Sequence, residues 1–407
     1  MPRVDTSPLG ALRPATVGDE AERLRASWLF KADNLRRAWA HFQAGDLTVS
    51  TMPYRVCLEL TQNCNFKCIM CAQAWEERFQ RYRPDFNMPM DLFVKLAEQL
   101  FPAAVNVDLR GFGETTVLPH WPEVVDVVER FPYIEWNLVS NLSLARDDLW
   151  DKMMKSNFVI GFSCDGASKE TFETIRVNGN FARTRHNLGV IRDAIARHGS
   201  GYLYFISVVQ RLNAHEMRAL VELAHEFGVN EVQFHIVRGP THMLVETDVF
   251  LFDDKFPRYV DQAIDAGLEL GVYTTFNDQI FTRRADPDKL RRASTVPQRA
   301  LPENAFHGAP WKDEVADYQT KLVNAYRIFE NQRCFKPFSY GNVNYLGELG
   351  TCNHMQYPVM PVMGDLRRQT VQEVWNGEKY QDFRRQLLTA TPKDSRCQWC
   401  FAHRLSD

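Results

Sequence analysis

The sequence lacks any stretch of about 18 consecutive apolar residues, so no membrane-spanning helix is expected. It also lacks an excess of one charge sign: 48 Lys and Arg stand against 51 Asp and Glu, a formal net charge of −3. Bulk attraction to nucleic acid or to an anionic membrane is therefore not expected. With 45% hydrophobic and 24% charged residues, the composition excludes a largely disordered chain.

Cysteine is the informative residue, with nine copies in 407 residues. The first residues, MPRVDTSPLG, lack the apolar run of a secretory leader. An odd count without such a leader argues against a disulfide framework and favours a reducing, cytoplasmic setting. In that setting clustered cysteines more often bind metal or carry out chemistry than form bridges.

Short apolar runs alternate with segments of helical period from Tyr54 onward. Six strand–helix alternations predict an α/β fold with a parallel sheet and right-handed crossovers, built as a partial (βα)6 TIM-like barrel. The expected strands are 55–60, 105–110, 134–139, 158–163, 203–209 and 231–237, and the expected helices are 90–101, 121–131, 146–155, 168–198 and 214–227.

The chain is expected to divide into four parts, each with its own composition. They are an N-terminal helical extension (1–52), the barrel core (53–240), a helical or loop bridge (241–330) and a small C-terminal domain (331–407). The bridge is expected to hold a helix near 254–270, a strand near 272–276 and a long loop over 283–312. The C-terminal domain is expected to hold a β-hairpin at 340–347 and a helix near 371–388.

Three cysteines, Cys64, Cys68 and Cys71, lie within eight residues directly after the first expected strand. Loops at the carboxyl ends of barrel strands are where such folds place active sites. Structural zinc requires four ligands in a closed tetrahedron, whereas three cysteines suit a [4Fe–4S] cluster with one open iron. A zinc knuckle, or three unrelated thiols, is the alternative.

The run LELTQNCNFKCIMC resembles the CxxxCxxC signature of the radical S-adenosylmethionine (SAM) enzymes. The resemblance implies that the open iron chelates SAM, and that reductive cleavage yields a 5′-deoxyadenosyl radical. It also implies an electron donor such as a flavodoxin or a ferredoxin. The run from Gly111 to Thr115, GFGET, is similar to the family's GGE motif. That similarity implies that Gly111, Gly113 and Glu114 hold the amino group of SAM.

The segment after the fourth expected strand, SCDG followed by SKETFETIRVNGNFARTRHNL, also resembles radical SAM enzymes, those that carry a SPASM or twitch extension. The resemblance implies that Ser163 contacts the ribose of SAM and that Arg176 contacts its carboxylate. A solvated helix arginine is the alternative for Arg176. Ser140 and Asn141, at the end of the third expected strand, are expected in the same cofactor site.

A second set of cysteines, Cys334, Cys352, Cys397 and Cys400, lies in the C-terminal domain. Four thiols brought together by a small hairpin domain make a closed site for an iron–sulfur cluster or for zinc. The pattern resembles the shorter, twitch form of the SPASM extension, because a full SPASM domain uses seven cysteines. The resemblance implies one auxiliary [4Fe–4S] cluster with four protein ligands.

Two cysteines remain, Cys57 and Cys164. Cys57 is expected to be a small core residue. Cys164 follows the fourth expected strand, where a thiol could donate hydrogen to a substrate radical. Alternation along that strand argues against this role, because Ser163 and Asp165 share one face and Cys164 belongs to the other.

The same alternation places polar residues on the interior face of a barrel whose outer face is covered by helices. The candidates for a substrate pocket or a base are Glu59, Asp108, Arg110, Glu135, Asn137, Tyr204, Gln233 and His235. They favour a small, sugar-like or aminocyclitol-like substrate that is dehydrogenated or epimerised, as in one branch of the family. The roughly 50 residues before the first strand are expected to be helical and do not resemble a separate leader-binding module. This also favours a small-molecule substrate over a peptide. The alternatives are modification of a ribosomally made peptide and a zinc-stabilised binding module without enzymatic activity.

Overall fold

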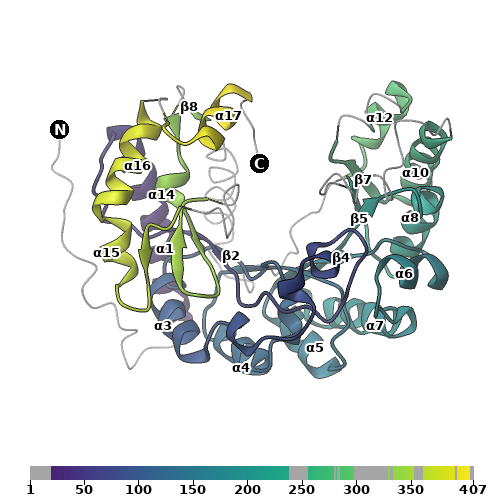
Figure 1. Ribbon diagram of the computed structural model, residues 1–407, viewed down its shortest axis with the longest axis horizontal. Helices are drawn as coiled ribbons and strands as arrows, with labels where there is room; N and C mark the ends of the chain where they lie inside the picture. The colour runs from purple at the N-terminus through teal and green to yellow at the C-terminus, as the bar shows by residue number, and fades with distance from the viewer. Residues whose placement is uncertain are drawn as a thin grey trace.

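The computed structural model of the protein describes residues 20–237, 255–278, 281, 285–297, 329–330, 333–352, 361–389 and 392–403. Its centre is a curved sheet whose convex face is covered by helices (Figure 1). Seven of its strands are parallel neighbours in chain order: β1 (Arg55–Leu58), β2 (Asn106–Asp108), β3 (Glu135–Ser140), β4 (Phe158–Ser163), β5 (Tyr202–Val209), β6 (Glu231–Ile236) and β7 (Tyr273–Phe276). The α/β partial barrel and its six expected strands, β1–β6, are thereby confirmed. Strand β7 is the one expected near 272–276.

The covering helices follow the strands that they connect. They are α3 (Met90–Leu100), α4 (Trp121–Val128), α5 (Asp147–Lys155), α6 (Lys169–Ile175), α7 (Phe181–His198), α8 (Met217–Glu226) and α10 (Phe256–Leu270). The expectation of one helix over 168–198 is wrong, because Asn178 adopts a left-handed φ of 70° and separates α6 from α7. None of the described helices is both long and apolar enough to cross a membrane.

The bridge region is more helical than its composition indicated. Within the loop expected over 283–312, residues 287–293 form helix α12 (Pro287–Ala293). The Asp286 side chain caps it by accepting from the Asp288 amide, and Pro287 stands at its first position. That part of the prediction is wrong, and residues 298–312 lie outside the described residues.

The two faces of the sheet differ in chemistry, as alternation requires. The outward face of β2, β3 and β4 carries Val107, Trp136, Leu138, Phe158 and Ile160, each at most 1% exposed beneath the helices. On the inward face the register sets polar residues side by side across strands: Asp108 beside Asn137 and Asn106 beside Glu135. The inward face of β2 and β3 is therefore polar.

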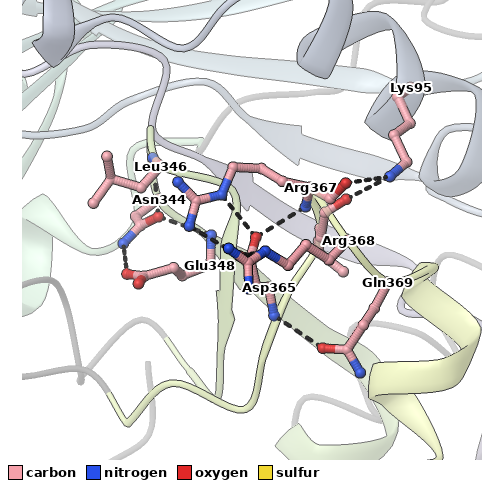
Figure 2. A network of polar contacts seen from close by, with 9 residues as sticks. Lys95, Asn344, Leu346, Glu348, Asp365, Arg367, Arg368 and Gln369 are labelled. Atoms are coloured by element: carbon pink, nitrogen blue, oxygen red, sulfur yellow. Dashed lines mark hydrogen bonds and ion pairs between the residues drawn. The ribbon is translucent and has the colours of Figure 1, made fainter.

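The C-terminal region adds three strands to the same sheet. They are β10 (Tyr340–Val343), β11 (Glu348–Gly350) and β12 (Gly364–Asp365), and β10 pairs in parallel with β1. The antiparallel pair β10–β11 confirms the expected hairpin. Asn344 closes its turn by accepting from the amides of Leu346 and Glu348 (Figure 2).

A side chain of the barrel contacts the turn that follows β12. The Lys95 ammonium of α3 donates to the carbonyls of Leu366 and Arg367, at 2.7 and 3.2 Å (Figure 2). Asp365 accepts from the Arg367 guanidinium in the same turn. Lys95 thereby ties the turn after β12 to helix α3.

Helix α1 (Glu20–Ala44) lies beside the C-terminal helices, in agreement with the expected N-terminal helix (Figure 1). Its Lys31 is 1% exposed and donates to the carbonyls of Phe101 and Ala104, just past the end of α3. Burial lowers the pKa of Lys31 to about 7. A lysine that caps a helix end in this way fixes the position of α1 on the barrel.

Arg384 joins the segment before β1 to the C-terminal helices α14 (Lys336–Ser339) and α16 (Glu378–Leu388). It is fully buried and donates to the carbonyls of Pro337 and Leu47 at 3.1 and 2.8 Å. Its guanidinium also lies 5.0 Å from the ring centre of Trp375. Burial lowers the pKa of Arg384 to about 10.

We expect the substitution Arg384→Met to lower the free energy of unfolding by about 2–3 kcal/mol, because two buried carbonyls lose their donor. The substitution Arg385→Met, at the next and exposed position of the same helix, removes only a surface pair with Asp382 and is the control. Thermal unfolding followed by circular dichroism compares the two. Equal midpoints would show that Arg384 is not a structural link.

Candidate active site

Cys64, Cys68 and Cys71 lie in the loop that follows the carboxyl end of β1. Two hydrogen bonds tie it to the end of α6 and the segment that follows: the Lys67 amide donates to Val177 O and the Ile69 amide to Ile175 O, at 2.9 and 3.1 Å. The loop is thus held along both sides of Cys68. The sequence placed these cysteines correctly, at the mouth of the barrel.

The thiols of this loop are near one another. Burial raises the pKa of Cys64 to about 12, and the neighbouring charges of Glu114, Cys68 and Cys71 act in the same direction. Burial also raises the pKa of Cys68. A cation bound by the loop would stabilise its thiols as thiolates.

No three His, Cys, Asp or Glu side chains among the described residues already stand in the arrangement of a metal site. The chemistry of the donors still fits an iron–sulfur cluster, because three thiolates are its ordinary protein ligands. Two polar atoms beside the loop are buried without a hydrogen-bond partner in the described part of the chain, Gln210 Oε1 and Arg176 Nε. Gln210 is fully buried, with its amide nitrogen 4.0 Å from the Met70 sulfur. Such atoms fit a polar ligand bound next to the cysteines.

Glu114 joins two of the loops expected to bind SAM. Its carboxylate accepts from the Ser140 hydroxyl at 2.9 Å, from the Asn141 amide at 2.7 Å, and from both the hydroxyl and the amide of Thr116. Burial raises the pKa of Glu114, and these donors oppose the shift. The structure therefore brings Glu114, Ser140 and Asn141 together, with both carboxylate oxygens already engaged.

The glycines of the same motif are explained by close approaches. A Cβ at Gly113 would lie 2.2 Å from Asn63 O, in the cysteine loop. A Cβ at Gly111 would lie 2.3 Å from the side chain of Glu59. Both positions need glycine because two loops cross there without space for a side chain.

Glu59 lies between the loop after β1 and the GFGET loop after β2. Its carboxylate accepts from the Phe112 amide at 3.0 Å and from the Gln62 side chain at 3.3 Å. Burial raises its pKa. The residue positions the GFGET loop, and its role as a base stays a prediction.

Arg176 is buried beside Cys68. Its guanidinium donates to the Cys68 sulfur at 3.5 Å and forms an ion pair with Asp165 at 2.7 Å. Asp165 is fully buried and also accepts from the Val208 amide at 2.6 Å. Ser163 lies two residues before Asp165 on the same interior face. The alternative of a solvated helix arginine is wrong, because Arg176 is enclosed.

Cys164 lies on the other side of the sheet. It is fully buried in the hydrophobic core, and its thiol donates to Gly166 O at 3.5 Å. Alternation along β4 gives it the helix-covered face, as the strand pattern indicated. The structure does not bring Cys164 to the interior of the barrel, so it does not support the hydrogen-donor hypothesis.

Several of the interior candidates have defined neighbours. Asp108 and Arg110 are an ion pair at 2.5 Å, and Asp108 stands beside Cys57 in the strand register. Tyr204 lies over Gly161, where a Cβ would be 2.8 Å from its ring. His235 lies on β6, the strand next to that of Tyr204, with its Nε2 2.9 Å from the Asn277 side chain. Cys57 is buried as expected, but on this polar face.

The four C-terminal cysteines are all described, and that they share one cluster stays a prediction. Cys334, Cys352 and Cys397 are buried and Cys400 is half-buried. Burial raises the pKa of Cys397 to about 12, and the charges of Cys352 and Cys400 act in the same direction. All nine cysteines lie in the described part of the chain, and none forms a disulfide.

Two residues of the site were missed from the sequence. Asp165 had been used only to set the strand phase, although its parity with Ser163 already pointed it inward. Gln210 follows β5 with the parity of Val208, and a polar residue at the end of an interior row was a signal for it.

Two family models match the chain. Residues 58–224 match the radical SAM superfamily, and residues 334–401 match the SPASM model, an iron–sulfur cluster-binding domain. The chain belongs to the radical SAM superfamily and carries a SPASM-type auxiliary domain. Its cofactors are accordingly a [4Fe–4S] cluster, SAM and an auxiliary cluster, and each matched range contains one of the two cysteine sets.

Solved structures share the fold at low sequence identity. SuiB of Streptococcus suis bound to SAM aligns with a TM-score of 0.56 at 12% identity, over 91% of this chain and 74% of SuiB. AnSMEcpe with bound SAM aligns with a TM-score of 0.51 at 13% identity, over 87% of this chain and 88% of its own.

One curated relative is similar over a shorter stretch. The tungsten-containing aldehyde ferredoxin oxidoreductase cofactor-modifying protein of Pyrococcus furiosus is 29% identical over 112 residues, which are 26% of this chain. The match spans 30% of that relative's length. Its activity is therefore no guide to the whole of this protein.

Proposed function

We propose that this enzyme abstracts a hydrogen atom from a C–H bond of a sugar-like or aminocyclitol-like small molecule, giving a dehydrogenated or an epimerised product. The observation that carries the proposal is the polar interior of the barrel, where Asp108 and Arg110 form an ion pair. Asp108 keeps 14% of its side chain exposed and Arg110 51%, so both remain open to a partner. A substrate rich in hydroxyl or amino groups matches such a surface.

The proposed reaction divides between the bound cofactors, the protein and an electron donor. Cys64, Cys68 and Cys71 would hold the open cluster, and when bound, cluster and SAM supply the radical that removes hydrogen. The protein holds the substrate carbon close and excludes water. An electron donor such as a flavodoxin or a ferredoxin completes the proposal. The lack of disulfides supports a reducing, cytoplasmic setting.

Modification of a peptide is the second candidate. It is favoured by one observation, the fold shared with SuiB bound to its precursor peptide SuiA, at a TM-score of 0.53. The two candidates differ in what donates hydrogen to 5′-deoxyadenosine. Deuterated sugars and aminocyclitols are tested alongside a deuterated peptide library. The substrate class is the one that transfers deuterium to 5′-deoxyadenosine. Transfer from peptides alone would overturn the small-molecule proposal.

We expect the substitution Asp108→Asn to lower substrate-dependent turnover at least about tenfold, because a charge-assisted hydrogen bond contributes about 1.5–3 kcal/mol. SAM binding should not change. Asp148→Asn is the matched control, since Asp148 pairs with Arg146 at the same two-residue spacing on the exterior. Steady-state kinetics and equilibrium dialysis with labelled SAM measure the two effects. Equal turnover in both variants would remove Asp108 from the pocket.

A further inference from the structure

The contact between Arg176 and Cys68 joins a buried cation to a cluster ligand. The guanidinium Nη1 donates to the Cys68 sulfur at 3.5 Å, while Nη2 lies 2.7 Å from Asp165 Oδ2. Side-chain exposure is 11% for Arg176 and 0% for Asp165. Water therefore screens neither interaction effectively.

The backbone on both sides of Arg176 is fixed. Residues 175 and 177 accept hydrogen bonds from Ile69 and Lys67 of the cysteine loop. Arg176 O accepts from the Gly179 amide at 2.7 Å, and a Cβ at Gly179 would lie 2.6 Å from that oxygen. These backbone contacts fix the position of Arg176 relative to Cys68.

Asp165 is fixed equally well from the other side. Its Oδ1 accepts from the Val208 amide of β5 at 2.6 Å, which leaves Oδ2 for Arg176. The side-chain amide of Asn213 holds the same turn by donating to Asp165 O at 3.0 Å. The carboxylate thus aims the guanidinium at the sulfur and balances its charge.

We propose that Arg176, held by Asp165, is a positioning residue that sets the reduction potential of the cluster bound by Cys64, Cys68 and Cys71. An N–H donor to a thiolate sulfur withdraws charge from the cluster and favours its reduced, more negative form. When bound, this cluster would supply the electron that SAM cleavage requires. The proposal rests on the cluster assignment and not on the substrate class.

The proposal differs from the role that resemblance implies for Arg176, a contact with the SAM carboxylate. A SAM contact alters SAM affinity and leaves the potential of the SAM-free cluster unchanged. A hydrogen bond to Cys68 alters that potential before SAM is present. Both can be measured on the same protein.

The test is a redox titration of the reconstituted, SAM-free holoprotein, followed by electron paramagnetic resonance. The open-cluster signal is identified as the one that SAM addition perturbs in a parallel sample. We expect Arg176→Met to shift the potential in the negative direction, and Asp165→Asn to shift it in the positive direction. The asparagine can still accept from the Val208 amide, but it leaves the arginine charge unbalanced. Arg183→Met, an exposed position of α7, is the control with the same loss of charge.

Shifts of opposite sign in the two variants distinguish an electrostatic effect from damage to the fold. Damage to the fold would not shift the two reduction potentials in these two directions. Arg176→Lys provides the same test if the methionine variant fails to take up iron, and its shift should be negative and smaller. Potentials equal to that of the wild type, in variants with full iron content, would overturn the proposal whether or not SAM affinity falls. Failure of the small-molecule proposal would leave these potentials unaffected.

Discussion

Alanine at Cys71 is expected to abolish formation of 5′-deoxyadenosine. The open cluster has three protein ligands, so loss of one thiolate leaves it without a stable site, and iron should fall by about four atoms per chain. Cys71 is half-buried and is the last ligand of the loop, so the change removes little packing. Iron analysis and chromatography of products after anaerobic reduction with SAM measure both effects.

Cys164→Ala is the matched control for that substitution. It also removes one thiol, but from the hydrophobic core on the other side of the sheet. Iron content and 5′-deoxyadenosine should stay at wild-type levels. Unchanged product formation by the Cys71 variant would mean that the loop does not hold the reacting cluster.

The substitution Cys352→Ala is expected to separate SAM cleavage from substrate turnover. Loss of one of four auxiliary ligands should again lower iron by about four atoms per chain. The local backbone should survive, because Asn342 donates to Cys352 O and Tyr380 donates to Gly350 O, and neither bond uses the thiol. We therefore expect 5′-deoxyadenosine to form while product from the substrate is lost.

Metal analysis decides between this account and structural zinc in the C-terminal domain. Wild-type protein should contain about eight iron atoms per chain, and the Cys352 variant about four. One zinc atom per chain, released by Cys352→Ala without loss of iron, would contradict the auxiliary cluster. Product formation at the wild-type rate would contradict its part in turnover.

The strands and the two faces of the sheet could be predicted because both follow from alternation within short segments. The polarity of Asp108, Glu135 and Gln233 indicated the interior face before any pairing was known. The pairing of β10 with β1 could not be predicted in that way. Contacts between segments so far apart in the chain leave no periodic signal in either of them.

The first cysteine set could be recognised from its close spacing, and the second from its resemblance to a known extension, whereas their cluster roles stay predictions. The contacts of the surrounding residues could not be predicted. Glu114 was expected to meet an ammonium group, yet its oxygens accept from Thr116, Ser140 and Asn141. The pair of Arg176 with Asp165 depends on the turn after β4, and the break between α6 and α7 was not expected.

The central claim is that the loop of Cys64, Cys68 and Cys71 holds a cluster that cleaves SAM. The most direct test is anaerobic reconstitution of the full chain, followed by reduction in the presence of SAM. The account predicts a brown, iron-containing protein that forms 5′-deoxyadenosine, and a paramagnetic signal that SAM perturbs. A colourless protein that contains zinc and no iron, and leaves SAM intact, would contradict it.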